Sequence, residues 1–183
     1  MGLARPRPAG RLRWGAVDAG RRTDLDRPEE KVLTTGRILF AVVAVAVFVV
    51  DRITKSLVTA EVPFGTEVQV IGNLVSITNV KNSGAAFGVA PAGATFFLIA
   101  SVVVSIGLVV YVVRNPGNPW TDATLGLILG GTLGNGFDRI AYGTVTDFIN
   151  FHVWPVFNLA DSAISVGVVL LIGGYLIRPK TAA

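Results

Sequence analysis

The sequence predicts a membrane protein, an all-α bundle of four transmembrane helices with a small extracytoplasmic antiparallel β-sheet. Hydrophobic residues make up 51% of the 183 positions and charged residues only 15%, whereas soluble domains average about 25% charged residues. Four apolar segments are separated by polar connections that contain glycine or proline. The basic residues behind the net charge of +4 are concentrated in the first 37 positions. That asymmetry fits the orientation of a membrane protein better than the binding of nucleic acid.

Composition also excludes several kinds of site. The chain has no cysteine, which rules out disulfides, thiolate metal sites and a cysteine nucleophile. His152 is the single histidine, so a histidine-rich metal site is impossible and a Ser-His-Asp triad is disfavoured. We interpret His152 as an interfacial residue, and we predict that its loss does not abolish activity.

The N-terminal part combines a polar tail with the first span. Residues 1–36 are rich in Arg, Asp, Gly and Pro, and we expect a flexible, basic cytoplasmic tail without a signal-peptide cleavage site. The first span is predicted at about 38–58. Its uninterrupted apolar run, Ile38 to Val50, would reach only about 20 Å across a hydrocarbon core of about 30 Å. The helix must therefore continue through Asp51 and Lys55, which are four residues apart and share a helix face.

Three further spans are predicted at about 90–113, 123–139 and 156–177. The second carries no charge, and the third repeats glycine at positions 126, 130 and 134, a spacing that lets helix backbones approach closely. Pro155 suits the first helical position of the fourth. The four-helix domain is thus predicted at 37–178, followed by a cytoplasmic tail at 179–183.

Four spans place both termini on the same side. The Arg-rich tail, Arg114 and the Arg178–Lys180 segment all fall on that side, which should be cytoplasmic. Residues 61–89 and 140–154 then lie outside. In an outer β-subdomain at about 61–89, strand-like runs at 67–71 and 74–78 flank Gly72-Asn73, a hairpin signal. Residues 148–154 suit a half-buried interfacial element.

Two aspartates, Asp147 and Asp161, fall near the outer ends of the last two spans. A carboxylate near mid-bilayer costs roughly 2.5–3.5 kcal/mol, so an intramembrane acid indicates a function. Two close carboxylates can share one proton, so that one serves as general base and the other donates a hydrogen bond. Asp147 could instead be a solvated loop residue or a helix N-cap. Asp161 could instead pair with Arg139 or Lys55.

Two other classes of function remain open at this point. A proton- or ion-coupled transporter would also use intramembrane carboxylates, but it predicts internal repeats, and the sequence shows none. A purely structural four-helix protein, held together by Asp–Arg and Asp–Lys pairs, would tolerate Asp147→Asn.

Five ordered sequence blocks resemble those of one family. The chain is similar to the bacterial lipoprotein signal peptidases (signal peptidase II) from about Arg37 to Ile177. The matching blocks are Asp51-Arg-Ile-Thr-Lys55, Asn82-Ser-Gly-Ala-Ala-Phe87, Gly134-Asn-Gly-Phe-Asp-Arg139, Val145-Thr-Asp-Phe-Ile149 and Phe157-Asn-Leu-Ala-Asp161. Any one block is a weak signal, but five in order on four predicted spans are a strong one.

The resemblance implies an intramembrane aspartic endopeptidase. Such an enzyme removes the signal peptide of prolipoproteins before a diacylglyceryl-modified cysteine at the outer face of the bacterial cytoplasmic (inner) membrane, without metal or organic cofactor. Its partners would be these lipid-modified signal peptides and membrane lipid, and no nucleic acid. The residues that match the family's catalytic dyad are Asp147 and Asp161.

The resemblance also implies a supporting set of residues. Asn82, Asn135, Arg139 and Asn158 match polar positions that line the family's site, and Gly84 to Phe87 would lie on the outer sheet. Asp51 and Lys55 are interpreted as a structural pair, and Asp138 as a residue that holds the end of the third helix and Arg139. The spacer between the two aspartates looks shorter than in many members, and the Arg-rich front tail lies outside the family pattern. Attraction of that tail to anionic lipid is our interpretation.

Overall fold

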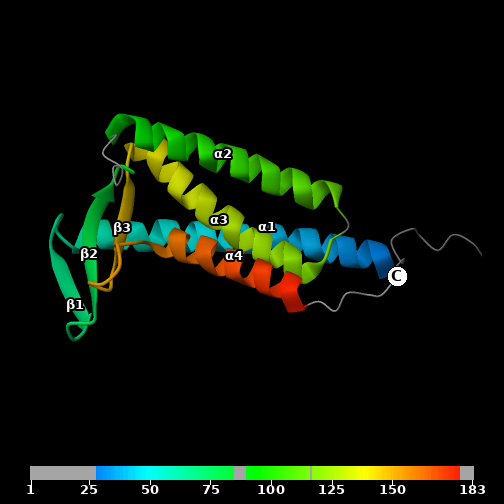
Figure 1. The fold of residues 1–183 in the computed structure, drawn as a ribbon, viewed down its shortest axis with the longest axis horizontal. Coiled ribbons are helices and arrows are strands. Elements are labelled where there is room, and N and C mark those ends of the chain that lie inside the picture. Colours follow the sequence, from blue (N-terminus) through cyan, green and yellow to red (C-terminus); the bar gives the residue numbers. More distant parts are fainter. Residues whose placement is uncertain (1–27, 85–89, 116, 178–183) are drawn as a thin grey trace, which may run out of the picture.

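Residues 28–84, 90–115 and 117–177 are described by the structure, a computed structural model with four helices and one sheet. The helices lie alongside one another, and the sheet lies at one end of the bundle (Figure 1). The elements, in chain order, are α1 (Pro28–Glu61), β1 (Glu67–Ile71), β2 (Val75–Asn82), α2 (Ala90–Arg114), α3 (Pro119–Tyr142), β3 (Val145–Asn150) and α4 (Leu159–Ile177).

Helix α1 is longer than the sequence predicts. It continues through Asp51 and Lys55, as the length of a span requires, and ends at Glu61. It begins at Pro28 rather than at Ile38, so residues 28–36 are helical and do not belong to a flexible tail. Residues 1–27 and 178–183 of the two predicted tails lie outside the described residues.

Helix α3 also extends beyond its predicted bounds because both of its ends are capped. The side chain of Asn118 accepts hydrogen bonds from the backbone N–H groups of Trp120 and Thr121, and Pro119 follows the cap, an arrangement typical of a helix start. At the other end, Gly143 has a φ of 73°, which glycine adopts readily.

The glycines of α3 allow this helix to sit at the centre of the bundle. A Cβ atom on Gly130 would lie 2.6 Å from the carbonyl oxygen of Ala44 on α1. On another face of α3, Gly131 meets the backbone of Ala160 on α4 in the same way. Helix α3 packs mainly on α1 and α4, and less on α2. The predicted role of glycine in close helix packing is therefore confirmed.

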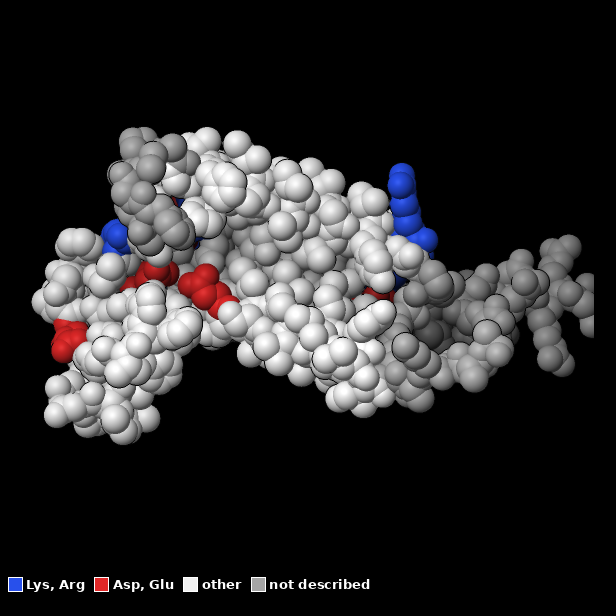
Figure 2. Space-filling model, viewed as in Figure 1, with Lys and Arg blue, Asp and Glu red and all other residues white. Residues whose placement is uncertain are grey.

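Many large apolar side chains of the described helices are exposed on the surface of the bundle. The buried apolar cluster holds only six side chains, from α1, α2 and α3, while large apolar side chains such as Ile106, Val103 and Val169 are more than half exposed. On the face in Figure 2, charged side chains gather toward the two ends of the molecule. Among the described residues, two helical segments, Gly93–Arg114 and Leu159–Ile177, are long and apolar enough to cross a membrane.

The sheet has the order β1-β2-β3, with both pairs antiparallel. The predicted hairpin is present, and Gly72 takes a φ of 46° in its turn, although β2 starts at Val75 and runs on to Asn82. The third strand was not predicted. It comes from the segment after α3, and it places Asp147 opposite Val80 of β2.

Candidate active site

Asp147 lies on strand β3, so its backbone is held by the sheet. Its side chain is almost fully buried. Asn82, at the end of β2, donates a hydrogen bond of 2.8 Å from Nδ2 to Oδ2 of Asp147. Asn158, just before α4, donates one of 2.7 Å to Oδ1. Each carboxylate oxygen therefore has an amide donor, and Asp147 is not the solvated loop residue that the sequence left open.

Asp161 lies in the first turn of α4, closer to the helix start than predicted. The helix begins at Leu159 rather than near Pro155, because Asn158 caps it. Oδ1 of Asn158 accepts the backbone N–H of Asp161, and Oδ2 of Asp161 accepts the backbone N–H of Asn158. This reciprocal pattern is a capping box. The positive end of the helix dipole also favours a carboxylate at this position.

Asn135 of α3 links Asp161 to the buried polar centre of the bundle. Its Nδ2 donates a 2.7 Å hydrogen bond to Oδ1 of Asp161. Its Oδ1 accepts hydrogen bonds from Nζ of Lys55 and from Nδ2 of Asn158. These partners fix the orientation of both amides. Asn158 thus bonds to both carboxylates, and Asn135 supports Asn158 and Asp161 together.

Four charged residues form a buried cluster behind this network. Lys55 lies 3.0 Å from Asp51 and 2.9 Å from Asp138, and Arg52 pairs with the same two carboxylates. Asp138 also accepts the backbone N–H of Thr146 on β3. The cluster joins α1, α3 and the sheet. Asp51 and Lys55 therefore form a buried ion pair, whereas Asp138 bonds to Arg52 and Lys55 rather than to Arg139.

Arg139 lies on the side of α3 that faces α2. Its guanidinium carbon is 5.2 Å from the ring centroid of Phe97, and Nη1 donates to the backbone carbonyl of Asn135. Its charge interacts with those of Asp161 and Asp147. Nε is buried without a hydrogen-bond partner among the described residues. Arg139 therefore places a positive charge beside the two aspartates.

Burial raises the pKa of Asp147 to about 6, and the nearby Asp161 charge adds to this effect. The hydrogen bonds from Asn82 and Asn158 act in the opposite direction. A carboxyl group with such a pKa can be protonated or ionised near neutral pH, as a shared-proton carboxylate pair requires. Among the described residues, no group of three His, Asp or Glu side chains is placed to hold a metal ion.

The predicted site residues that the structure describes lie near one another, linked through Asn82, Asn135 and Asn158. Gly84 lies beyond the end of β2 rather than on the sheet, and its N–H donates to Oδ1 of Asn82. Ala85, Ala86 and Phe87 lie outside the described residues. Sequence reasoning missed Arg52 and Phe97, although Arg52 stands inside a recognised block. The Asn-x-x-Asp spacing at 158–161, typical of a capping box, could have located the start of α4.

Comparison with known proteins identifies the family. A model of signal peptidase (SPase) II matches residues 43–177. A lipoprotein signal peptidase from Halothermothrix orenii is 39% identical over 131 residues, which cover 72% of this chain and 90% of the relative. The corresponding protein from Rhodococcus jostii is 40% identical over 169 residues, 85% of this chain and 83% of the relative. A bacterial membrane enzyme solved by the in meso method at 1.9 Å is 32% identical, with a TM-score of 0.71 and coverage of 76% and 94%.

The apolar helices and the solved membrane enzyme of the same fold define a membrane protein. The chain belongs to the signal peptidase II family. It is therefore a protease, and the aspartic type is the class of this family.

Proposed function

We propose that this protein is an intramembrane endopeptidase that removes the signal peptide of prolipoproteins, with Asp147 and Asp161 as the catalytic pair. The single observation that carries this proposal is the position of Asn158. It binds Asp147 through its side chain and Asp161 through its backbone N–H and side-chain carbonyl. Two acids separated by fourteen positions in the sequence are thus held around one residue.

The reaction follows from this pair. The ionised aspartate takes a proton from a water molecule, and the water oxygen attacks the scissile carbonyl carbon. The protonated aspartate donates to the carbonyl oxygen as negative charge develops there. Collapse of the tetrahedral intermediate breaks the C–N bond and passes a proton to the leaving amine. Because the pKa of Asp147 is raised to about 6, Asp147 can act either as the ionised base or as the protonated donor.

Asn82 and Arg139 are placed to bind the substrate beside the dyad. Asn82 holds Asp147 from the last position of β2, the central strand of the sheet. Arg139 provides a planar set of donors next to the two acids. We assign both to positioning of the peptide backbone and the carboxylates.

The lengths of the helices support four spans with the sheet on the outer side. Helix α1 has 34 residues and α3 has 24, about 51 and 36 Å at the rise of an α-helix, against a hydrocarbon core of about 30 Å. Helix α1 begins and α4 ends at the end away from the sheet (Figure 1). We therefore place residues 37–178 as the membrane domain of a bacterial cytoplasmic membrane protein, with both termini inside.

This placement matches a lipid-modified substrate. A diacylglyceryl-modified cysteine keeps its acyl chains in the bilayer, so the peptide bond before it lies near the interface. Asp161 in the first turn of α4 and Asp147 on the adjacent strand lie at that depth.

Cleavage of a diacylglyceryl-modified prolipoprotein by purified protein tests the proposal. We expect Asp147→Asn and Asp161→Asn each to lose nearly all activity. Asp122→Asn, which changes a buried acid at the other end of α3, should remain active and serves as the matched control. Full activity in either dyad variant would overturn the catalytic assignment. A well-folded wild-type protein that cleaves no lipid-modified substrate would overturn the proposed function.

A further inference from the structure

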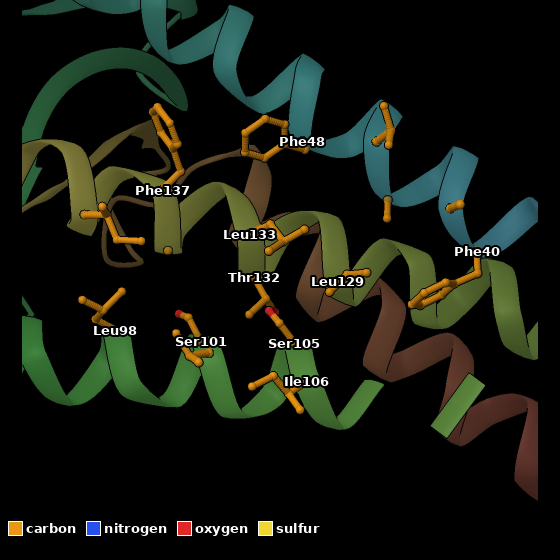
Figure 3. A pocket seen from close by; sticks show the side chains of 16 residues that line it. Phe40, Phe48, Leu98, Ser101, Ser105, Ile106, Leu129, Thr132, Leu133 and Phe137 are labelled. Atoms are coloured by element: carbon orange, nitrogen blue, oxygen red, sulfur yellow. The ribbon is translucent and has the colours of Figure 1, made fainter. Parts of the chain in front are cut away.

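An apolar groove of about 660 Å³ runs between α1 and α2, with α3 as its floor. Figure 3 shows Phe48 from α1, Ile106 from α2 and Leu133 from α3 among the side chains around it. The hydroxyls of Ser101 and Thr132 in its wall donate to carbonyls of their own helices. The groove therefore offers hydrocarbon contacts and little for a polar ligand.

The length and depth of the groove suit one leaflet of a bilayer. Along α3 it extends from Leu129 to Ile140, roughly 16 Å at the rise of an α-helix, about half of a hydrocarbon core of about 30 Å. Ile140 lies two residues before the end of α3 at Tyr142. With the sheet on the outer side, the α3 lining lies in the outer part of that helix, whereas the α1 lining, Phe40 to Phe48, lies at the middle of α1. The groove therefore runs from the centre of the membrane toward the outer interface.

A polar pocket of about 420 Å³ lies beyond this groove, where α1 and α3 meet the sheet. Its lining includes Arg52, Lys55, Lys81 and Asp138, together with the hydroxyl-bearing Tyr142 and Thr146. Thr146 and Asp147 are consecutive on β3, so their side chains point to opposite faces of the sheet. The pocket therefore lies on the face of β3 opposite Asp147, and Lys55, which bonds to Asn135, stands between the pocket and the proposed active site.

Phe137 and Arg52 join the groove to the pocket. Phe137 lines the groove and Arg52 lines the pocket, and the guanidinium carbon lies 5.0 Å from the ring centroid. The same ring makes edge contacts with Phe48 and Tyr142, at centroid distances of 6.0 and 6.3 Å. An apolar compartment and a polar compartment thus share one wall.

The polar pocket carries positive charge that its own carboxylates do not balance. Asp51 and Asp138 pair with Arg52 and Lys55. Lys81 donates to the neutral hydroxyl of Thr146, and within the described residues no carboxylate pairs with it. Nε of Arg52 is also buried, and no residue that the structure describes forms a hydrogen bond with it. Guanidinium and ammonium groups are the usual partners of phosphate.

We propose that this composite site binds an anionic phospholipid of the outer leaflet, with an acyl chain in the groove and its phosphate beside Lys81 and Arg52. Helices α1 and α2 each pack against α3 and barely touch each other, so the chain would fill the space between them. The choice of leaflet rests on the membrane orientation proposed above. Binding itself does not depend on peptidase activity, so the two proposals can fail separately.

The test is a lipid titration of the purified full-length protein, read by native mass spectrometry. The probes are phosphatidylglycerol, diacylglycerol with the same chains, and inorganic phosphate. We expect phosphatidylglycerol to bind about tenfold more tightly than diacylglycerol, as one or two charge-assisted hydrogen bonds provide. Equal binding of the two lipids, or inorganic phosphate displacing phosphatidylglycerol at equal concentration, would overturn the proposal.

Four variants locate the site. Lys81→Gln should weaken phosphatidylglycerol binding about tenfold and leave diacylglycerol binding unchanged. Val102→Phe, which narrows the groove, should weaken both lipids. Arg114→Gln is the matched control for Lys81→Gln, because it changes an exposed basic residue in the last turn of α2, away from the sheet. Val103→Phe is the matched control for Val102→Phe, because it changes an exposed valine outside the groove. Equal losses in variants and controls would show that the lipid binds elsewhere.

Discussion

Nδ2 of Asn158 lies 2.7 Å from Oδ1 of Asp147, in a hydrogen bond that connects the cap of α4 to strand β3. The same asparagine caps α4 by accepting the backbone N–H of Asp161. One side chain therefore sets where α4 begins and where the two carboxylates stand relative to each other. Substitutions of Asn158 can therefore separate its effect on the stability of the protein from its effect on the positions of the two carboxylates.

Substitution of Asn158 should separate these two roles. A serine hydroxyl can cap the helix but is too short to keep the bond to Asp147. We expect Asn158→Ser to keep most of the stability and to lose about 100-fold in kcat, a typical effect of misplaced catalytic groups. Asn158→Ala should lose activity to the same extent and also about 1 kcal/mol of stability through the missing cap. Cleavage kinetics and thermal unfolding measure the two effects, and a fully active Asn158→Ser would contradict the positioning role.

The raised pKa of Asp147 predicts a pH-dependent stability. The folded protein binds this proton more tightly than the unfolded chain, whose Asp pKa is about 3.9, so ionisation of Asp147 destabilises the fold. The penalty is absent below about pH 4, grows as the pH rises toward 6, and stays constant above it. Asp147→Asn should therefore gain stability relative to wild type at pH 7.5 but not at pH 4. Thermal unfolding at both pH values tests this, and a difference that does not change with pH would contradict it.

Lys55 is predicted to be essential for the fold although it is outside the dyad. It is almost fully buried and contacts Asp51, Asp138 and Asn135. Its removal leaves buried carboxylates with one cation fewer, which typically costs about 3–5 kcal/mol. We expect Lys55→Met to lower the unfolding temperature strongly. Lys81→Met, at an exposed lysine, should change stability by less than about 0.5 kcal/mol, and equal effects would contradict the role of the buried cluster.

Much of the helical architecture could be predicted because its signals are local. Apolar runs indicated the four helices, and glycine at four-residue spacing indicated where α3 approaches its neighbours. Gly72-Asn73 indicated the hairpin. Each of these patterns acts within one element or between two adjacent ones.

The features of the structure that could not be predicted depend on contacts between residues that lie far apart in the sequence. Strand β3 exists because β2 offers it a free edge, so Asp147 could not be distinguished from a loop residue. Arg52 donates a hydrogen bond to Asp138, which is 86 positions away in the sequence. No local sequence pattern predicts that contact. The start of α4 was assigned from Pro155, whereas the capping box of Asn158 and Asp161 places it at Leu159.

His152 should be dispensable for catalysis. Its ring nitrogens lie 3.3 Å from Ser76 Oγ and from Asn150 Nδ2, among groups at the tip of the sheet. Its φ is 60°, a conformation that asparagine and glycine tolerate better than other residues. We therefore expect His152→Asn to retain activity within about twofold, because the substitution preserves the backbone and removes only a ring that is uninvolved in the chemistry. His152→Val, with a β-branched side chain that opposes this φ, should destabilise the fold by about 1–3 kcal/mol. If the His152→Asn protein were stable but did not cleave the substrate, the prediction would be contradicted. His152, rather than one of the two aspartates, would then be assigned as the general base.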